Sequence, residues 1–337
     1  MTAISPEIYR GNIITSRVRL ARNLQGMPFT VRETKLAKEI VKKVNRALVK
    51  CDTFNLYYMA NLSEMQLEAM KERHLVSQAL IDNRLAGACL INQDESLSVM
   101  VCEEDVLREQ CFMRGLRIDE AYKRLSIIDD ELSKNLDIAF SEKFGYLTAC
   151  PTNLGTGLRA SVMMFLPALT ESGKMKSIIK EVASLGLTVR GVYGEGSDAE
   201  GYMYQISNEV TLGVSEHEIL NEVRQTVERI CMAEREESER LYGKNELKTM
   251  DKTRKAYGVL TNAVMLNYSE FLGLIAQVKL GAMLGMINIS DVEKIDDLIV
   301  NVRPANLCLS YGKKLSAMDR DLYRAEVVSK ALIKLKE

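Results

Sequence analysis

The residues best suited to chemistry in this sequence are arginines that lie in short motifs. In residues 15–23, TSRVRLARN, Arg17 and Arg19 lie two apart in a stretch that we expect to be extended, so both side chains would project to the same side. Arginine suits phosphate because its guanidinium stays charged and donates paired hydrogen bonds. Taken alone, so short a match is more typical of a solvated basic segment.

Two further motifs place an arginine beside small or acidic residues. Residues 150–162, CPTNLGTGLRASV, contain glycines that let the backbone approach a ligand closely, and Arg159 follows them. Residues 102–110, CEEDVLREQ, place a cluster of three acids before Arg108. The competing structural interpretation of those three acids is a solvated turn.

A fourth motif, VRGVYGEGSDAEG in residues 189–201, has Arg190 followed by a glycine-rich loop that carries the acids Glu195, Asp198 and Glu200. The sequence contains neither a GxxxxGK[ST] phosphate loop nor a GxGxxG loop followed by HRD and DFG. A bound phosphate would therefore be held by another arrangement, for which the arginines are the candidates.

Three of these motifs, in this order, resemble the signature of the ATP:guanidino phosphotransferases, SRxRxxRN, NEEDHLR and CPxNLGTGxRxSV. The acidic motif departs from the family at Cys102 and Val106, which replace an asparagine and a histidine. A substrate domain precedes the first motif in creatine and arginine kinases, whereas only fourteen residues precede Thr15 here. The resemblance is therefore closest to members that phosphorylate arginine side chains in proteins, and it implies an ATP-dependent protein-arginine N-phosphotransferase.

This resemblance implies a nucleotide site built largely from arginines. It assigns the ATP phosphates to Arg17, Arg19, Arg108, Arg159 and Arg190. It extends the site to His74 and to neighbours of the arginines, namely Thr15, Ser16, Val18, Ala160, Ser161, Val162, Met163, Gly191, Val192, Tyr193, Gly194 and Glu195. A Mg²⁺ ion would bridge the phosphate oxygens and keep most of its waters, so we expect no metal site made by the protein itself.

The resemblance assigns Glu104 the task of orienting the substrate guanidinium and taking its proton. A base is needed because a guanidinium is a cation with no free lone pair. Asp198 stands where arginine kinases have a longer glutamate, so Glu195 or Glu200 would serve instead, or a protein substrate needs only one base. Cys150 matches the reactive cysteine of the family, and the resemblance implies a thiolate that helps to orient the guanidinium; a buried packing thiol is the alternative.

Near the C-terminus the chain reads Arg320-Asp321-Leu322-Tyr323-Arg324-Ala325, which resembles an RDxxRA motif of the protein-phosphorylating members. Arg320 and Arg324 are four apart and so share one helix face, where they would grip a phosphate while Asp321 pairs with a guanidinium. The resemblance implies an allosteric site for phosphoarginine, the product of the reaction. An exposed helix with salt bridges is the alternative.

The resemblance also implies partners. These are protein substrates modified on arginine, a second copy of the chain in a homodimer, a cysteine-rich zinc-binding activator, a Clp unfoldase and protease, and a stress-gene repressor. The implied biological setting is protein quality control in the stress response.

The remaining pattern predicts the elements that position these motifs. Apolar residues recur at helical spacing in residues 31–50, 64–81, 117–138 and 171–185. Short apolar runs predict a hairpin in residues 85–104, a strand, a loop and a second strand across residues 146–166, and further strands in residues 187–193 and 202–208.

After Ser215 the pattern becomes helical through to the C-terminus, with a proline-containing break in residues 301–306. We place the domain boundary in the charged run at 233–240, which gives a catalytic domain in residues 1–238 and a helical domain for dimerisation and phosphoarginine binding in residues 239–337. The expected fold class is α+β, with a phosphagen-kinase-like antiparallel sheet flanked by helices and followed by the helical domain.

The composition of the 337 residues excludes several classes of protein. The 45 Lys and Arg residues against 46 Asp and Glu give a net charge of −1, which argues against direct nucleic-acid binding. No apolar run approaches the ~20 residues of a membrane-spanning helix, and the first residues lack a secretory signal pattern. Seven cysteines without a CxxC pair fit reduced thiols, so we expect a cytoplasmic protein.

Two alternative functions stay open at this point. The same arginines would serve a kinase for a free guanidino metabolite, or a non-catalytic adaptor that binds phosphoarginine. The missing N-terminal substrate domain argues against the first. The presence of Arg17, Arg19, Glu104 and Arg159 together argues against the second.

Overall fold

An antiparallel sheet forms the centre of the protein. The computed structural model describes residues 11–191 and 200–336. Within them the sheet has eight strands in the order β2-β3-β4-β5-β1-β8-β10-β9. The strands are β1 (Ile13–Arg22), β2 (Phe54–Tyr58), β3 (Ala88–Asn92), β4 (Leu97–Val101), β5 (Leu107–Arg114), β8 (Leu158–Phe165), β9 (Leu187–Gly191) and β10 (Met203–Asn208).

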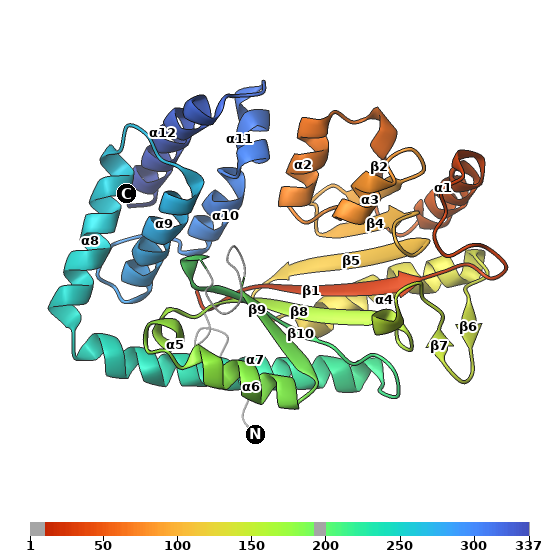
Figure 1. Cartoon of the computed structure of the whole chain (residues 1–337), viewed down its shortest axis with the longest axis horizontal. Coiled ribbons are helices and arrows are strands. Elements are labelled where there is room, and N and C mark those ends of the chain that lie inside the picture. Colours follow the sequence, from red (N-terminus) through yellow and green to blue (C-terminus); the bar gives the residue numbers. More distant parts are fainter. Residues whose placement is uncertain (1–10, 192–199, 337) are drawn as a thin grey trace.

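One face of the sheet carries the main hydrophobic core. Helices α4 (Ile118–Asn135) and α7 (Glu216–Gly243) pack across the central strands, and α6 (Met175–Ser184) packs against β9 (Figure 1). Helix α1 (Thr34–Leu48) lies beside α4. Because side chains alternate along a strand, Val18 and Leu20 of β1 are buried in this core, and Arg17 and Arg19 emerge on the opposite face.

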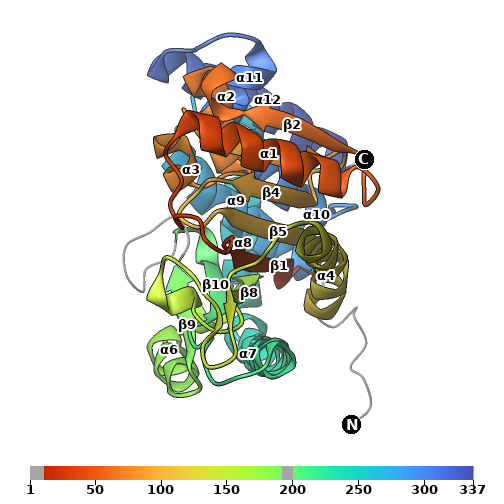
Figure 2. The same ribbon diagram turned by 90° about the vertical axis from the view of Figure 1, so that its right-hand side faces the viewer.

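The opposite face is covered at its two ends and hollowed between them. Helices α2 (Glu64–Glu72) and α3 (Gln78–Asp82) pack on β3 and β4 through a small cluster that includes Cys89 and Met100. The C-terminal helices stand at the other end of the sheet on the same side (Figure 1). Seen from the side, α2 and α11 (Pro304–Tyr311) lie next to each other (Figure 2).

The C-terminal region shares its core with the end of the sheet. It contains α8 (Glu246–Asn262), α9 (Tyr268–Met283), α10 (Glu293–Asn301), α11 and α12 (Ala317–Lys336). Phe165 of β8, Ala168 of α5 (Pro167–Glu171) and Met203 of β10 are buried in the same cluster as these helices. Helix α7 runs without interruption through residues 233–240, so the two regions are joined by a continuous helix as well as by packing.

Most of the expected helices and strands are confirmed, with one clear correction. The single helix expected across residues 64–81 is wrong, because α2 ends at Glu72 and α3 begins only at Gln78. His74 between them adopts a left-handed backbone with φ 62°. The Oγ of Ser77 accepts a hydrogen bond from the Leu80 amide at 3.1 Å, which starts the second helix as an N-cap.

The strand, loop and strand expected across residues 146–166 are present, but the first strand is very short. This first strand, β7 (Gly145–Tyr146), has two residues and pairs with β6 (Phe140–Ser141). A short 3-10 turn, Pro151–Asn153, then leads toward β8. Among the described residues no helix is long and apolar enough to cross a membrane. All seven cysteines lie in the described residues and are free thiols.

Candidate active site

The register of the sheet gathers arginines on its open face. On β1 and β8, Arg19 lies directly opposite Arg159, and Arg17 lies opposite Ser161. On β5, Arg108 lies opposite Ala21, two residues beyond Arg19 along β1. Directly paired residues point to the same side of an antiparallel sheet. The four arginines from three separate motifs therefore converge on one patch.

Within the described part of the chain, three of the four arginines in this cluster are not paired with an acid, whereas Arg108 contacts Glu103 and Glu104. Among the described residues, Arg17, Arg19 and Arg159 form no ion pair, and the Nε atom of each is buried without a hydrogen-bond partner. Burial, followed by the charges of Arg108 and Arg159, lowers the pKa of Arg17 to about 9. Burial and the neighbouring arginines also lower the pKa of Arg19. A bound polyanion would supply the missing partners and remove this repulsion.

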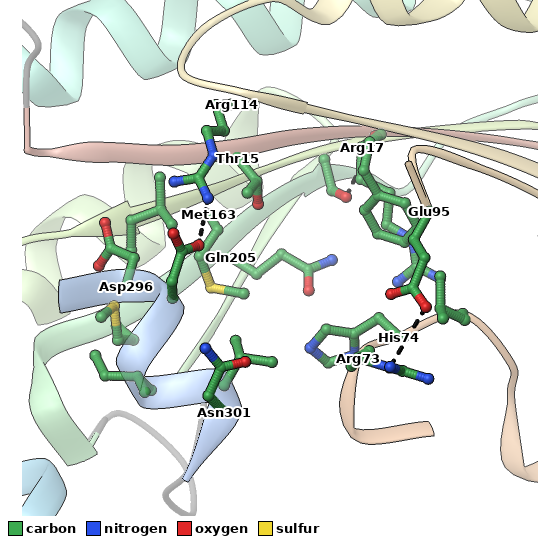
Figure 3. Close-up of a pocket in the computed structure, with 18 residues that line it drawn as sticks. Thr15, Arg17, Arg73, His74, Glu95, Arg114, Met163, Gln205, Asp296 and Asn301 are labelled. Atoms are coloured by element: carbon green, nitrogen blue, oxygen red, sulfur yellow. Dashed lines mark hydrogen bonds and ion pairs between the residues drawn. The ribbon is translucent and has the colours of Figure 1, made fainter. Parts of the chain in front are cut away.

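A large pocket of about 460 Å³ opens beside Arg17. Its walls are the sheet, the turn that carries Arg73 and His74, and helix α10 (Figure 3). Apolar side chains such as Met163 and Ile299 contribute much of its lining. This size is typical of pockets for small ligands, and the apolar end suits a base while the Arg17 end suits phosphates.

His74 contributes a neutral ring to the large pocket. Burial, followed by the charges of Arg17, Arg303 and Arg19, lowers the pKa of His74 to about 3. Its carbonyl oxygen accepts a hydrogen bond from Gln110 Nε2 at 2.9 Å. Gln110 Oε1 in turn accepts a hydrogen bond from Arg17 Nη2 at 2.5 Å. The side chain of Gln110 thus connects the His74 turn to the arginine cluster.

A small pocket of about 140 Å³ lies on the other side of the cluster. Residues from three of the four motifs line it: Arg19, Glu104, Arg108, Cys150 and Arg159. Thr152, Asn153 and Gly157 complete the wall on the side of the cysteine loop. The arrangement places a carboxylate and a thiol next to the arginine cluster.

The three consecutive acids of the acidic motif have three different roles. Glu103 is buried, and its Oε1 accepts hydrogen bonds from Arg108 Nη1 at 2.6 Å and from Ser77 Oγ at 2.5 Å. The side chain of Glu104 is 45% exposed and lies 3.4 Å from Arg108 Nη2. The alternative of a solvated turn is therefore wrong for Glu103, which holds Arg108 in place while Glu104 stays open to the pocket.

Asp105, the third acid, fixes the loop that carries Cys150. It is fully buried, and its Oδ1 accepts hydrogen bonds from the Ala149 amide at 2.6 Å and from Asn23 Nδ2 at 2.7 Å. The Cys150 thiol is half-buried and lies 3.0 Å from Thr152 Oγ1. Cys150 and Arg159 line the same small pocket, so the thiol lies close to the cluster.

The structure separates the other expected nucleotide-site residues into two groups. Thr15, Ser161 and Met163 line the large pocket. Val18, Ala160 and Val162 lie on the opposite face of the sheet, in the hydrophobic core, so only their backbone lies near the site. Ser16 is also buried, and its Oγ donates a hydrogen bond to the Gly115 carbonyl at 2.7 Å.

Arg190 and the loop after it are only partly described. Arg190 is exposed on β9, opposite Gln205 of β10, and its charge contributes to the lowered pKa of Arg159 after the effect of burial. Gly191 ends the same strand. The other expected residues of this motif lie outside the described residues: Val192, Tyr193, Gly194, Glu195 and Asp198. The side chain of Glu200 is likewise not described.

Several residues of the site were not among the residues expected from the motifs. Gln110 and Phe112 follow Arg108 at alternate positions of β5, so strand alternation alone would have placed them on the same face. Phe112 lies under Arg17, with 5.0 Å between the guanidinium carbon and the ring centroid. Arg73 and helix α10 come from elements far away in the sequence, and no local pattern identifies them as pocket walls.

The C-terminal motif is placed on α12, where its two arginines differ. Arg324 is buried, and its Nε and Nη1 donate to the carbonyls of Val302 and Leu266 at 3.0 and 2.8 Å. Its Nη1 also donates to Asp321 Oδ1 at 2.7 Å. Arg320 is only half-buried and donates to the Leu315 carbonyl at 3.0 Å. In this conformation Arg320 is open to a ligand, whereas Arg324 holds the helical core together.

The remaining residues of that motif are also divided between exposed and buried positions. Leu322 is exposed and Ala325 is buried in the core of the helical region. Tyr323 is half-buried, and its ring packs edge-on against Tyr311 with centroids 4.9 Å apart. The open part of the motif therefore consists of Arg320, Asp321 and Leu322.

Comparison with known proteins identifies the family to which the sequence belongs. Residues 35–237 match the family described as ATP:guanido phosphotransferase, C-terminal catalytic domain. The chain belongs to the ATP:guanido phosphotransferase family. Residues 246–337 match a second family, described as the protein-arginine kinase McsB C-terminal domain.

Relatives within this family match nearly the whole length of the chain. The chain is 42% identical to a protein-arginine kinase of Caldanaerobacter subterraneus over 96% of its own length and 97% of the relative. It is 41% identical to a protein-arginine kinase of Clostridium acetobutylicum over 95% of its length and 96% of that protein. Within the ATP:guanido phosphotransferase family the chain thus groups with the protein-arginine kinases.

Solved structures agree with the expected α+β fold. A duplicated taurocyamine kinase from Schistosoma mansoni with bound transition-state analogue components matches with a TM-score of 0.61 and 27% identity. The match covers 69% of this chain and 34% of that duplicated enzyme. The antiparallel sheet with flanking helices is therefore the fold of a phosphagen kinase.

Proposed function

We propose that this protein transfers the γ-phosphoryl group of ATP to arginine side chains of proteins. The observation that carries the proposal is the small pocket, in which Glu104 lies among Arg19, Arg108 and Arg159. Arg19 and Arg159 form no ion pair among the described residues and so have capacity for an anion, while Arg108 is held by Glu103. The large pocket is lined by Arg17, two residues before Arg19 on the same face of β1, and its volume suits a nucleotide. A guanidinium that enters the small pocket would meet both the carboxylate and the terminal phosphate.

The chemistry follows from this placement. A guanidinium nitrogen of the substrate attacks the γ-phosphorus, the new N–P bond forms, and the bond from phosphorus to the ADP oxygen breaks. Glu104 orients the guanidinium and accepts the proton that the attacking nitrogen loses. Arg19, Arg108 and Arg159 stabilise the charge on the migrating group, which is the main requirement of phosphoryl transfer.

The ATP brings Mg²⁺ with it in this proposal. No group of three or more His, Cys, Asp or Glu side chains suited to a metal occurs in residues 11–191 and 200–336. Mg²⁺ keeps several of its waters and is usually bound with the substrate's phosphates, so in this proposal it would take few ligands from the protein and would neutralise phosphate charge.

The wider biological role is proposed from the family resemblance. Phosphorylated proteins would be marked for a Clp protease, and a stress-gene repressor would be among the substrates. A cysteine-rich zinc-binding activator and a second copy of the chain would be partners, with residues 239–337 as the dimerisation and phosphoarginine-binding domain. Seven free thiols fit a reducing compartment, so we place the protein in the cytoplasm.

The test is mass spectrometry under conditions that preserve the acid-labile N–P bond. The full chain is given Mg-ATP with a mixed protein substrate and, separately, with free L-arginine. We expect phosphate on protein arginines, and Glu104→Gln should reduce the rate by ~10²–10⁴-fold while ATP binding is retained. Glu142→Gln, an exposed glutamate on the β6–β7 turn, is the matched control and should behave as the wild type.

The other outcomes separate the alternatives. Phosphate on free arginine alone would assign the protein to the metabolite kinases. No transfer to either substrate, together with tight binding of phosphoarginine, would favour an adaptor. Full activity of the Glu104→Gln protein would show that Glu104 is not the base.

A further inference from the structure

Glu72, the last residue of α2, makes a double contact with the C-terminal region. Its carboxylate accepts hydrogen bonds from the backbone amides of Ala305 and Asn306, each with an oxygen at 2.9 Å. Its backbone carbonyl accepts a hydrogen bond from Arg303 Nη1 at 2.7 Å. The carboxylate thus caps the N-terminus of α11, where free amides and the helix dipole favour a negative charge.

This contact lies directly before the turn that forms one wall of the large pocket. Arg73 and His74, the next two residues, both line the pocket. The carbonyl of His74 is held by Gln110, which also binds Arg17. Glu72 is therefore linked to the arginine cluster through the backbone of Arg73 and His74 and the side chain of Gln110. A shift of Glu72 would move the His74 turn relative to Arg17.

The partner of Glu72 is joined to the opposite wall of the same pocket. Ile299, Val300 and Asn301 at the end of α10 line the pocket. Asn301 lies across it from His74 (Figure 3). The Nδ2 of Asn306 donates to the Val300 carbonyl at 3.1 Å, which ties α11 to that wall. The hydrogen bonds from α11 to Glu72 therefore connect two walls of the pocket, the His74 turn and the end of α10, which are more than 200 residues apart in the chain.

We propose that Glu72 is a positioning residue of the nucleotide pocket, which sets the spacing between the His74 turn and α10 by clasping the N-terminus of α11. The ligand of this pocket is a nucleoside triphosphate, so the inference rests on the proposed function for the identity of the ligand. Glu72 does not line the pocket, and it acts on the nucleotide only through the residues it holds. The C-terminal helical region thereby becomes a structural part of the nucleotide site.

The test compares Glu72→Ala and Glu72→Gln with Glu68→Ala in the full-length chain. Glu68 is one turn earlier on α2 and makes only an exposed ion pair with Lys71, so it is a matched control. The dissociation constant of ATP, the KM for ATP and kcat are measured for each. We expect Glu72→Ala to raise the dissociation constant and KM roughly tenfold while kcat at saturating ATP changes less than threefold, because loss of positioning weakens binding before chemistry.

Glu72→Gln keeps the volume but accepts a weaker hydrogen bond from the two amides, so its effect should lie between those of the wild type and Glu72→Ala. It also carries the test alone if Glu72→Ala does not fold. The proposal is overturned if the folded Glu72 variants bind ATP as tightly as Glu68→Ala. Failure of the proposed function is seen separately, since a wild type that binds ATP but phosphorylates no protein arginine overturns that function and leaves the binding comparison intact.

Discussion

Arg19 and Arg159 lie directly opposite each other on the neighbouring strands β1 and β8, with the Nε atom of each buried and unpartnered. Two cations side by side in a half-buried position repel each other, and burial lowers the pKa of both. Such an arrangement costs stability in the absence of an anion. In the proposed function a bound phosphate would relieve this repulsion, which the free protein carries at the expense of its stability.

This cost leads to a prediction for Arg19→Met. Removal of one of two apposed cations should raise the free energy of unfolding by about 1 kcal/mol, since apolar replacements of buried charges are often stabilising. The same substitution should abolish phosphoryl transfer. Urea unfolding and the transfer assay check the two effects, with the exposed Arg46→Met as a control that changes neither. A less stable but active Arg19→Met protein would contradict the account of the cluster.

His74 gives a prediction for the pH dependence of stability. Its pKa is lowered to about 3 in the folded protein, against 6.5 for the free side chain, so the unfolded chain binds more protons between those values. This contribution to stability is therefore complete above pH 6.5 and is lost as the pH falls. Between pH 7 and pH 5 it should amount to about 2 kcal/mol.

The measurement for His74 is a comparison of unfolding free energies at several pH values. His74→Gln should lose less stability than the wild type on going from pH 7 to pH 5, by about the same 2 kcal/mol. The exposed His217→Gln protein should follow the wild type. Parallel pH profiles for wild type and His74→Gln would show that His74 titrates normally.

Thiol labelling tests the placement of Cys150. Only Cys51 and Cys150 are partly exposed among the seven cysteines, and burial raises the pKa of Cys89 and Cys102 to about 12. A short treatment with iodoacetamide should therefore label Cys51 and Cys150 alone. In a Cys51→Ser protein a single label at Cys150 should stop phosphoryl transfer, because the adduct fills the small pocket. Retained activity of that labelled protein would remove Cys150 from the site.

The two arginines of the C-terminal motif should respond differently to substitution. Arg324→Ala leaves Asp321 and two buried carbonyls without their donor, and we expect a loss of about 3 kcal/mol in the free energy of unfolding. Arg320→Ala should change stability by less than about 0.5 kcal/mol but weaken the binding of phosphoarginine. Thermal unfolding and a binding titration with free phosphoarginine measure both. Equal losses of stability would contradict the assignment of separate roles.

The sequence was sufficient for those parts of the site that depend on local pattern. Alternation in β1 predicted that Arg17 and Arg19 share a face, and that prediction is confirmed. The motif resemblance predicted the family and the α+β fold, and the comparisons confirm both. Local patterns succeed here because side-chain direction along a strand depends only on the strand itself.

The sequence was insufficient where the site depends on contacts between distant segments. The apolar spacing of residues 64–81 indicated one helix, but the tertiary contacts of Glu72 and Gln110 stabilise a turn with a left-handed His74. Helix α10, which forms one wall of the large pocket, follows β5 by nearly 200 residues. No pattern in the sequence near β5 indicates that α10 lies there. Periodicity reports which face of an element is apolar, and it does not report which element will cover that face.

The alternation of β1 also decides which genetic changes this strand tolerates. Arg17 and Arg19 face the site while Val18 and Leu20 face the core, so the same ten residues serve both purposes. Insertion or deletion of one residue would exchange the two sets, with guanidinium groups forced into the core and apolar side chains into the phosphate site. Point substitutions at this strand are graded in their effects. A change in its length would remove the active site and the core together, so we expect β1 to vary in residue type among functional descendants and never in length.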